Sequence, residues 1–169
     1  MSILTRQAIL DAMKAGHIKI EPFNEQYLGP ASMDLTLSNK FRIYKKAIDV
    51  VDVVNGTDYK DYSELIETET MVISPGATIL GITEEVITLT GPYCGWLEGR
   101  SSFARLGLMV HISASFMQPG IANRQVLEIT NLGPVPMRLH AGTQICQFIF
   151  QTTLGEADYT GRFEGQMEP

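Results

Sequence analysis

The sequence is poor in the residues that bind metals or form cross-links: its 169 residues include two cysteines and three histidines. The histidines are scattered along the chain, and neither cysteine has a close cysteine partner. We therefore expect Cys94 and Cys146 to be buried free thiols in a reducing compartment, the cytoplasm. No recognised zinc-binding pattern and no glycine-rich phosphate loop is present, so the sequence predicts no zinc site.

Long apolar runs and an excess of positive charge are also missing. No run approaches the roughly 20 apolar residues that a membrane-spanning helix requires. The first residues lack the charged-then-apolar layout of a signal peptide. A net charge of −6 argues against a nucleic-acid-binding surface, but a few arginines could still hold a single nucleotide. We expect neither a membrane nor a nucleic acid as partner.

What is present indicates one mainly β domain over residues 1–169. A single amphipathic helix is predicted at 5–16, capped by Thr5 and followed by Gly16. Residues 45–69 are acidic and resemble an exposed irregular excursion, and the tail 151–169 is polar. Short strands separated by turn residues indicate a sandwich, jelly roll or compact barrel. They are expected at 33–37, 71–73, 78–82, 86–89, 93–98, 108–113, 126–130, 135–139 and 144–150.

A cluster of arginines and hydroxyls indicates an anion site. Arg100 and Arg105 can contact phosphate oxygens, and Ser101 and Ser102 can donate from short side chains. Ser102 could also cap a short helical turn that Gly107 ends. The alternative is an ordinary capped turn with two surface arginines.

Glu128 is an isolated carboxylate in a predicted strand. Alternation places Leu127 and Ile129 on one face and Glu128 on the other. A carboxylate covered by a ligand suits general acid–base chemistry, whereas an uncovered one is an ordinary surface residue. His111, in an apolar run, is expected to be a core histidine and not a ligand.

The tail segment from Tyr159 to Gln166 combines an arginine, aromatic rings and hinge glycines. Such a segment can fold over a nucleotide as a lid. The alternative is a frayed terminus.

These segments occur in the order seen in dCTP deaminases, and the chain resembles that family, within the dUTPase-like superfamily, over nearly its whole length. The most specific match is the run Gly99–Leu108. The resemblance implies a distorted jelly-roll-like β barrel with a short N-terminal helix, assembled as a homotrimer with active sites between subunits. Its other segments are Gly29–Leu35, Trp96–Leu108, Ser113-Ala114, Pro119-Gly120, Val126–Glu128, Gly142–Ile145 and Tyr159–Gln166.

The resemblance also implies roles for residues. Glu128 matches the glutamate that takes a proton from water attacking C4 of cytosine, without zinc. Arg105 and the Ala114 backbone match positions that orient this water, with Ser101 nearby. Mg²⁺ is expected on the substrate phosphates. The implied substrate contacts are Arg100, Ser101, Ser102, Arg105, Gln118, Val126, Tyr159, Arg162 and Gln166, the last three from the lid.

The expected reaction is dCTP to dUTP and ammonia. Three residues depart from the family pattern. Gln118 replaces an aspartate that approaches the deoxyribose, and Ser115 occupies a position that is often histidine. Asn123 lies in a turn that usually contains glycine. A glutamine cannot act as a base, so Gln118 weighs against the alternative of a dUMP-forming bifunctional enzyme or a dUTPase. A non-catalytic regulatory trimer is a further alternative, and inhibition by dTTP stays open.

Overall fold

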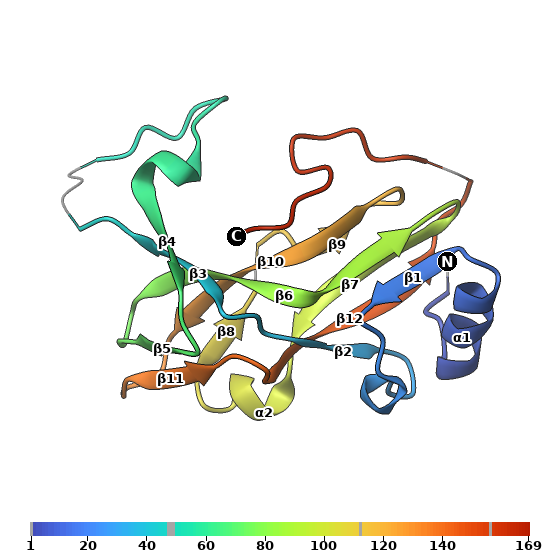
Figure 1. Ribbon diagram of the computed structural model, residues 1–169, viewed down its shortest axis with the longest axis horizontal. Coiled ribbons are helices and arrows are strands. Elements are labelled where there is room, and N and C mark those ends of the chain that lie inside the picture. Colours follow the sequence, from blue (N-terminus) through green and yellow to red (C-terminus); the bar gives the residue numbers. More distant parts are fainter. Residues whose placement is uncertain (1, 47–49, 112, 156) are drawn as a thin grey trace.

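The computed structural model describes residues 2–46, 50–111, 113–155 and 157–169, and shows a mainly β protein (Figure 1). The helices are α1 (Arg6–Lys14) and α2 (Ser101–Ala104), with short 3₁₀ helices η1 (Glu25–Tyr27) and η2 (Tyr59–Tyr62). The strands are β1 (Ile18–Glu21), β2 (Met33–Thr36), β3 (Lys40–Tyr44), β4 (Ser63–Glu67), β5 (Thr70–Ile73), β6 (Thr78–Leu89), β7 (Tyr93–Gly99), β8 (Leu108–Val110), β9 (Phe116–Met117), β10 (Ala122–Asn131), β11 (Met137–His140) and β12 (Gln144–Thr152).

The strands form two larger antiparallel sheets and one small one. The first sheet has the order β4-β3-β6-β10-β8, with β1 paired to β6, and the second has the order β2-β12-β7-β9. Strands β5 and β11 pair separately. Apolar side chains of both larger sheets meet in one core, for example Leu127 from β10 and Phe148 from β12, neither of which is exposed. The predicted mainly β class is confirmed.

The helix predicted at 5–16 is confirmed as α1, with Ile9 and Ala12 buried and Gly16 in a left-handed conformation just beyond its end. Thr5 occupies the predicted N-cap position, but its side chain accepts no hydrogen bond from the first turn. The chain is instead held at this point by the Arg6 N–H, which donates to the carbonyl of Pro30 at 2.7 Å.

Three predicted segments differ in the structure. The separate strands at 78–82 and 86–89 are one long strand, β6. The strand predicted at 108–113 ends at Val110, because His111 adopts a positive φ of 56° that extended backbone does not allow. The prediction of an irregular excursion at 45–69 is wrong for η2 and β4, since β4 pairs with β3 along its whole length. Asp49, one of its acids, lies outside the described residues.

A bulge in β6 shapes the middle of the first sheet. Between the pairs Arg124↔Val86 and Val126↔Ile82, Gln125 alone in β10 faces the segment Thr83–Glu85 in β6. The Thr83 hydroxyl accepts from the Gln125 N–H at 2.9 Å and donates to the Glu85 carbonyl at 2.9 Å. These bonds replace the missing ladder bonds at the point where the bulge bends β6.

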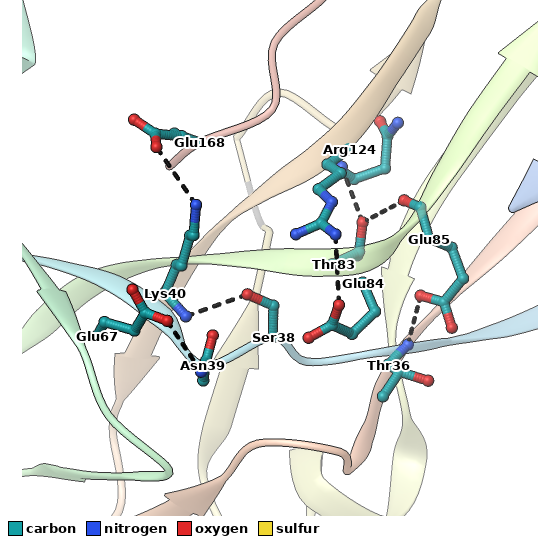
Figure 2. Close-up of polar contacts among 11 residues, drawn as sticks. Thr36, Ser38, Asn39, Lys40, Glu67, Thr83, Glu84, Glu85, Arg124 and Glu168 are labelled. Atoms are coloured by element: carbon teal, nitrogen blue, oxygen red, sulfur yellow. Dashed lines mark hydrogen bonds and ion pairs between the residues drawn. The ribbon is translucent and has the colours of Figure 1, made fainter. Parts of the chain in front are cut away.

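Figure 2 shows how side chains hold this bulge. The Glu85 carboxylate accepts from the Thr36 N–H at 2.8 Å, and Glu84 lies 3.4 Å from Arg124. Burial raises the pKa of Glu85 despite the donated hydrogen bond. The bulge therefore ties β2 to β6 and places Arg124 and Gln125 beside the pocket described below.

Cys94 and Cys146 are both buried free thiols, as predicted. Burial raises the pKa of each, so both thiols stay protonated and inert at neutral pH. Among the described residues, no helix has the length and apolar character needed to cross a membrane.

We predict that Gly95→Ala destabilises the fold. A Cβ atom at Gly95 would overlap the buried ring of Phe148 and lie 2.7 Å from the carbonyl oxygen of Ile149. Overpacking of this kind costs about 1–3 kcal/mol or more. The measurement is the free energy of unfolding from urea titration. The matched control is Gly99→Ala in the same strand, where the nearest atom is 3.8 Å away; equal losses in both variants would contradict the prediction.

Candidate active site

A pocket of about 440 Å³ lies between β10, the segment that follows β8, and the C-terminal tail. Its wall is rich in apolar and aromatic groups, with a few polar side chains, which is the usual character of a small-molecule site. Six of the predicted catalytic and substrate-contact residues line it: Ala114, Gln118, Val126, Glu128, Tyr159 and Gln166.

Glu128 reaches this pocket because of the alternation in β10. Leu127 and Ile129 are fully buried in the core, as predicted, and the Glu128 side chain on the opposite face is 35% exposed. The alternative of an uncovered surface carboxylate does not describe it, since the pocket wall surrounds it. A carboxylate here can meet a bound ligand while remaining held by a rigid strand.

His111 is the nearest charged partner of Glu128. Its Nδ1 lies 3.1 Å from Glu128 Oε2, off the alignment of a good hydrogen bond, and neither atom has another partner among the described residues. The His111 N–H also donates to the Glu128 carbonyl at 3.0 Å. The positive φ of His111 turns both its backbone and its ring toward Glu128.

The tautomer of His111 follows from its other nitrogen. Nε2 lies 2.9 Å from the Ala114 carbonyl, which can only accept, so Nε2 carries a proton. A neutral ring would then turn the Nδ1 lone pair toward a carboxylate. Protonation replaces this repulsion with an ion pair.

The pKa of His111 reflects this arrangement. Burial on its own would lower the pKa, but the Glu128 carboxylate and the carbonyls of Ala114 and Val126 outweigh it and raise the pKa above its usual value. Protonated His111 therefore stabilises the fold. This contribution is complete below the pKa of histidine in the unfolded chain and is lost as the pH rises through the higher folded value.

The prediction that His111 is a core histidine is confirmed by its burial. Its contact with Glu128 was not predicted. The two residues are far apart in sequence, and the alternation within β10 does not indicate which segment lies against Glu128. The positions of Tyr44 and Tyr59 in the pocket wall were not predicted either. Tyr59 comes from the segment expected to be irregular, and Tyr44 lies just before it.

The tail lies against the pocket and is not frayed. The Tyr159 N–H donates to the Pro119 carbonyl at 2.9 Å, and the Arg124 N–H donates to the Gln166 carbonyl at 3.0 Å. The Gln166 amide also donates to the Tyr59 hydroxyl at 2.9 Å. These contacts place Tyr159 and Gln166 in the pocket wall.

Arg162 lies in a neighbouring hollow of about 300 Å³ and does not line the main pocket. Its guanidinium is 2.9 Å from the Asp58 carboxylate and donates to the Thr57 carbonyl at 3.2 Å. A hydrogen bond from the Lys60 N–H and the nearby Arg162 charge lower the pKa of Asp58, so the carboxylate is ionised at neutral pH. The segment 57–60 thus holds the tail through Arg162, outside the main pocket.

The turn predicted to bind an anion lies away from the pocket. Arg100, Ser101, Ser102 and Arg105 do not line the pocket, and α2 lies at the lower edge of the molecule while the tail crosses the upper edge (Figure 1). The prediction that Ser102 caps this turn is wrong, since α2 begins at Ser101 and its cap position is Arg100. Gly107 ends the turn at a φ of 92°, as predicted.

Arg100 contacts its own chain. Its guanidinium lies 3.2 Å from the Asp34 carboxylate and donates to the Gln144 carbonyl at 2.7 Å. Arg105 and both serines are exposed. Within one chain, therefore, the structure brings together the predicted carboxylate, water-orienting backbone and tail, but not the predicted phosphate contacts.

The described residues contain no group of three or more His, Cys, Asp or Glu side chains arranged to hold a metal ion. Cys94, Cys146, His17 and His140 all lie away from the pocket wall.

A family model and named relatives match most of this chain. The model of the dCTP deaminase-like family matches residues 3–153. A "dCTP deaminase, dUMP-forming" of Methanopyrus kandleri is 34% identical, over all of this chain and 94% of its own length. The protein of the same name from Methanobrevibacter smithii is 33% identical over 94% of this chain and 84% of its own.

A solved structure shows the same fold. The crystal structure of 2'-deoxycytidine 5'-triphosphate deaminase from Agrobacterium tumefaciens superposes with a TM-score of 0.69 at 21% identity. The match covers 89% of this chain and 48% of that one. With its β fold, its pocket carboxylate and a family match over most of its length, the chain belongs to the dCTP deaminase-like family.

Proposed function

We propose that the protein hydrolytically deaminates dCTP, with Glu128 as general base and acid. The observation that carries this proposal is the Glu128 carboxylate in the wall of a nucleotide-sized pocket, paired at 3.1 Å with a buried histidine. The names of the relatives support cytosine deoxyribonucleotide as the substrate class.

In the proposed reaction, a water oxygen adds to C4 of cytosine and gives one proton to Glu128, which passes it to N3 of the ring. The second proton of the added hydroxyl then goes to the 4-amino group through Glu128, the C4–N bond breaks, and ammonia leaves as the C4 carbonyl forms. The products are dUTP and ammonia.

Protonated His111 holds Oε2 of Glu128 and leaves the other carboxylate oxygen for the water. The Ala114 carbonyl accepts from His111 and has a second lone pair for that water, in line with its expected role. Both groups are fixed before substrate binds, so little reorganisation is needed during the reaction.

Mg²⁺ would bind the substrate triphosphate and neutralise part of its charge. It would be held mainly by phosphate oxygens and water, which suits a pocket whose described residues include no carboxylate cage.

A second candidate is that the protein carries dCTP on to dUMP and pyrophosphate. It is favoured by the names of its relatives, which are dUMP-forming enzymes. It is disfavoured by Gln118, an uncharged residue at the pocket that cannot act as a base. The common first step, deamination at Glu128, is the same in both.

We further propose that the active form is a homotrimer in which Arg100, Ser101, Ser102 and Arg105 of one copy bind the phosphates in the pocket of the next. These residues cannot serve their own pocket, as described above. Leu106 and Leu132, which flank the same turn, are 62% and 64% exposed, as expected for a surface covered by another copy.

The tail is proposed to act as a lid. Tyr159 and Gln166 already line the pocket and would contact the nucleotide, while Arg162 would act through the ion pair with Asp58. The lid would exclude water other than the reacting one and slow nucleotide release.

We predict that Glu128→Gln binds dCTP with nearly unchanged affinity but releases no ammonia, because the amide has a similar shape and no basic oxygen. Calorimetry measures binding, and an assay with dCTP and Mg²⁺ measures ammonia and separates dUTP from dUMP and pyrophosphate. Glu64→Gln, an exposed strand carboxylate outside the pocket, is the control and should keep full turnover. Unchanged turnover in Glu128→Gln would refute the mechanism, and absence of turnover in the wild type would favour a regulatory role. Pyrophosphate release by the wild type would establish the second candidate.

The variants Arg105→Ala and Glu128→Gln are each expected to be inactive alone. We predict that activity returns when the two are unfolded together and refolded as mixed assemblies. In a closed ring, a pocket that takes Arg105 from one variant and Glu128 from the other is intact, which gives about a quarter of wild-type turnover in an equal mixture. The control is mixing without unfolding, which leaves each variant in its own assembly. No recovery after joint refolding would show that each site lies within one chain.

We predict that Asp58→Asn loosens the tail. An exposed ion pair of this kind is a weak contact, so trypsin cleavage after Arg162 should accelerate only about two- to fivefold. Mass spectrometry of the released peptide 163–169 measures the rate. Asp61→Asn, in η2 but without a contact to the tail among the described residues, is the matched control. Equal cleavage rates for both variants would contradict the proposed role of Asp58.

A further inference from the structure

The pocket wall contains an arginine that the proposed function does not use. Arg124 in β10 lines the pocket, and the lining residues that the structure describes include no other arginine and no lysine. The Arg124 side chain is 26% exposed, so part of its surface can be reached by a ligand. A cation in the wall of an otherwise apolar and aromatic pocket favours a ligand that carries negative charge.

Arg124 lies on the same face of β10 as Glu128. Burial alternates along residues 123–129, and the partly exposed positions are Arg124, Val126 and Glu128, all of which line the pocket. The bulge opposite Gln125 does not interrupt this alternation, because its extra residues are in β6. The side chains of Arg124 and Glu128 therefore point to the same side of the sheet.

The pocket runs along β10 from Glu128 toward Arg124. The residues of β10 that line it are 123–126 and Glu128, and the residues that follow Glu128 in this strand do not. Four residues of strand separate Arg124 from Glu128 by roughly 13 Å between Cα atoms. A nucleotide whose cytosine C4 lies at Glu128 would therefore extend its sugar and phosphates toward Arg124.

The guanidinium of Arg124 is held weakly. Figure 2 shows it reaching from β10 to Glu84 in the β6 bulge, where one nitrogen lies 3.4 Å from a carboxylate oxygen. This side chain has no other ion pair or hydrogen bond within the described part of the chain. The Glu84 side chain is itself 39% exposed, and an exposed pair contributes little to stability. Most of the N–H donors of the guanidinium are thus available to a ligand.

The tail covers the same end of the pocket. The Gln166 carbonyl accepts from the Arg124 N–H at 3.0 Å, and the Asn123 side-chain amide donates to the Phe163 carbonyl at 3.3 Å. These bonds hold Phe163 and Gln166, which both line the pocket, beside this end of β10. Arg124 therefore lies where the proposed lid would close over the part of the nucleotide farthest from Glu128.

The chemistry of dCTP identifies what this guanidinium would contact. Cytosine and the sugar offer neutral acceptors, whereas the phosphates offer charged oxygens that match the fork of guanidinium donors. We infer that Arg124 exchanges Glu84 for phosphate oxygens of the nucleotide, which makes it a specificity-determining residue for phosphorylated substrates. This inference rests on the proposed function. It adds a cation from the chain that supplies Glu128 to the arginines proposed to come from the next copy.

The test measures binding of dCTP by calorimetry with Mg²⁺, in the Glu128→Gln protein so that no turnover occurs. Arg124→Gln should weaken binding about five- to twentyfold, because charge-assisted hydrogen bonds to phosphate are lost. Glu84→Gln should instead tighten binding about two- to fivefold, because it releases the guanidinium from a weak ion pair. A purely structural role of this pair would move the affinity in the same direction in both variants.

Three controls separate this exchange from other effects. Glu64→Gln, on an exposed strand position outside the pocket, removes the same charge as Glu84→Gln and should leave the affinity for dCTP unchanged. In the Arg124→Gln background, Glu84→Gln should lose most of its gain, because no guanidinium is left to release. The third control is 2'-deoxycytidine, titrated by NMR at millimolar concentration. It has no phosphate and should bind equally to Arg124→Gln and its parent.

Glu84→Gln decides the question if Arg124→Gln does not fold. Unchanged affinity for dCTP in Arg124→Gln, unchanged or weaker binding in Glu84→Gln, or an equal loss for 2'-deoxycytidine would overturn the inference. A full gain from Glu84→Gln without Arg124 would also overturn it, since Glu84 would then act on the nucleotide directly. Failure of the parent to bind dCTP would instead refute the proposed function, and the role of Arg124 with it.

Discussion

The contact between Glu128 and His111 is the interaction on which the site depends. A carboxylate in a strand that faces a pocket has no fixed orientation until something holds one of its oxygens. His111 does this, since its ring is buried, its Nε2 is committed to the Ala114 carbonyl, and its Nδ1 lies 3.1 Å from Glu128. The left-handed backbone of His111 makes this arrangement possible. Such a conformation costs about 1–3 kcal/mol in a non-glycine residue and persists where surrounding contacts enforce it.

The same left-handed residue also organises the surroundings of the pocket. It ends β8 at Val110 and turns the chain away from β10, so that Ala114 and Gln118 can lie over the face that carries Glu128. On the other side, the bulge at Thr83–Glu85 bends β6 where it faces Gln125. His111 and Gln125, at these two irregularities, both line the pocket.

The charged residues around the site act at different distances from it. Glu128 faces the pocket, Arg162 holds the tail from a neighbouring hollow, and Arg100 is committed to Asp34 within its own sheet. In the proposed function, this distribution lets a chain of net charge −6 bind a triphosphate. Apart from Arg124, the cations proposed to bind the phosphates lie on an exposed turn with apolar neighbours, from which a second copy of the chain would present them to another pocket.

Local patterns in the sequence determined the elements. The alternation of Leu127, Glu128 and Ile129 predicted which face of β10 the carboxylate occupies, because a strand has a period of two whatever covers it. Turn glycines such as Gly107 and the amphipathic pattern of α1 were equally local and were confirmed. The family pattern also led to Glu128 as the candidate catalytic residue, a role that stays a prediction.

Only the tertiary structure decided what lies opposite these faces. The pairing of His111 with Glu128, the approach of Tyr59 to Gln166 and the hydrogen bond from Asn123 to Phe163 join segments far apart in the chain. Periodicity does not encode such contacts. The strand β4 was missed for a related reason: its charged, exposed residues resemble a loop, and pairing with β3 makes it a strand. The sequence by itself determined which side chains point out of each element; the packing of distant segments decided which of them meet.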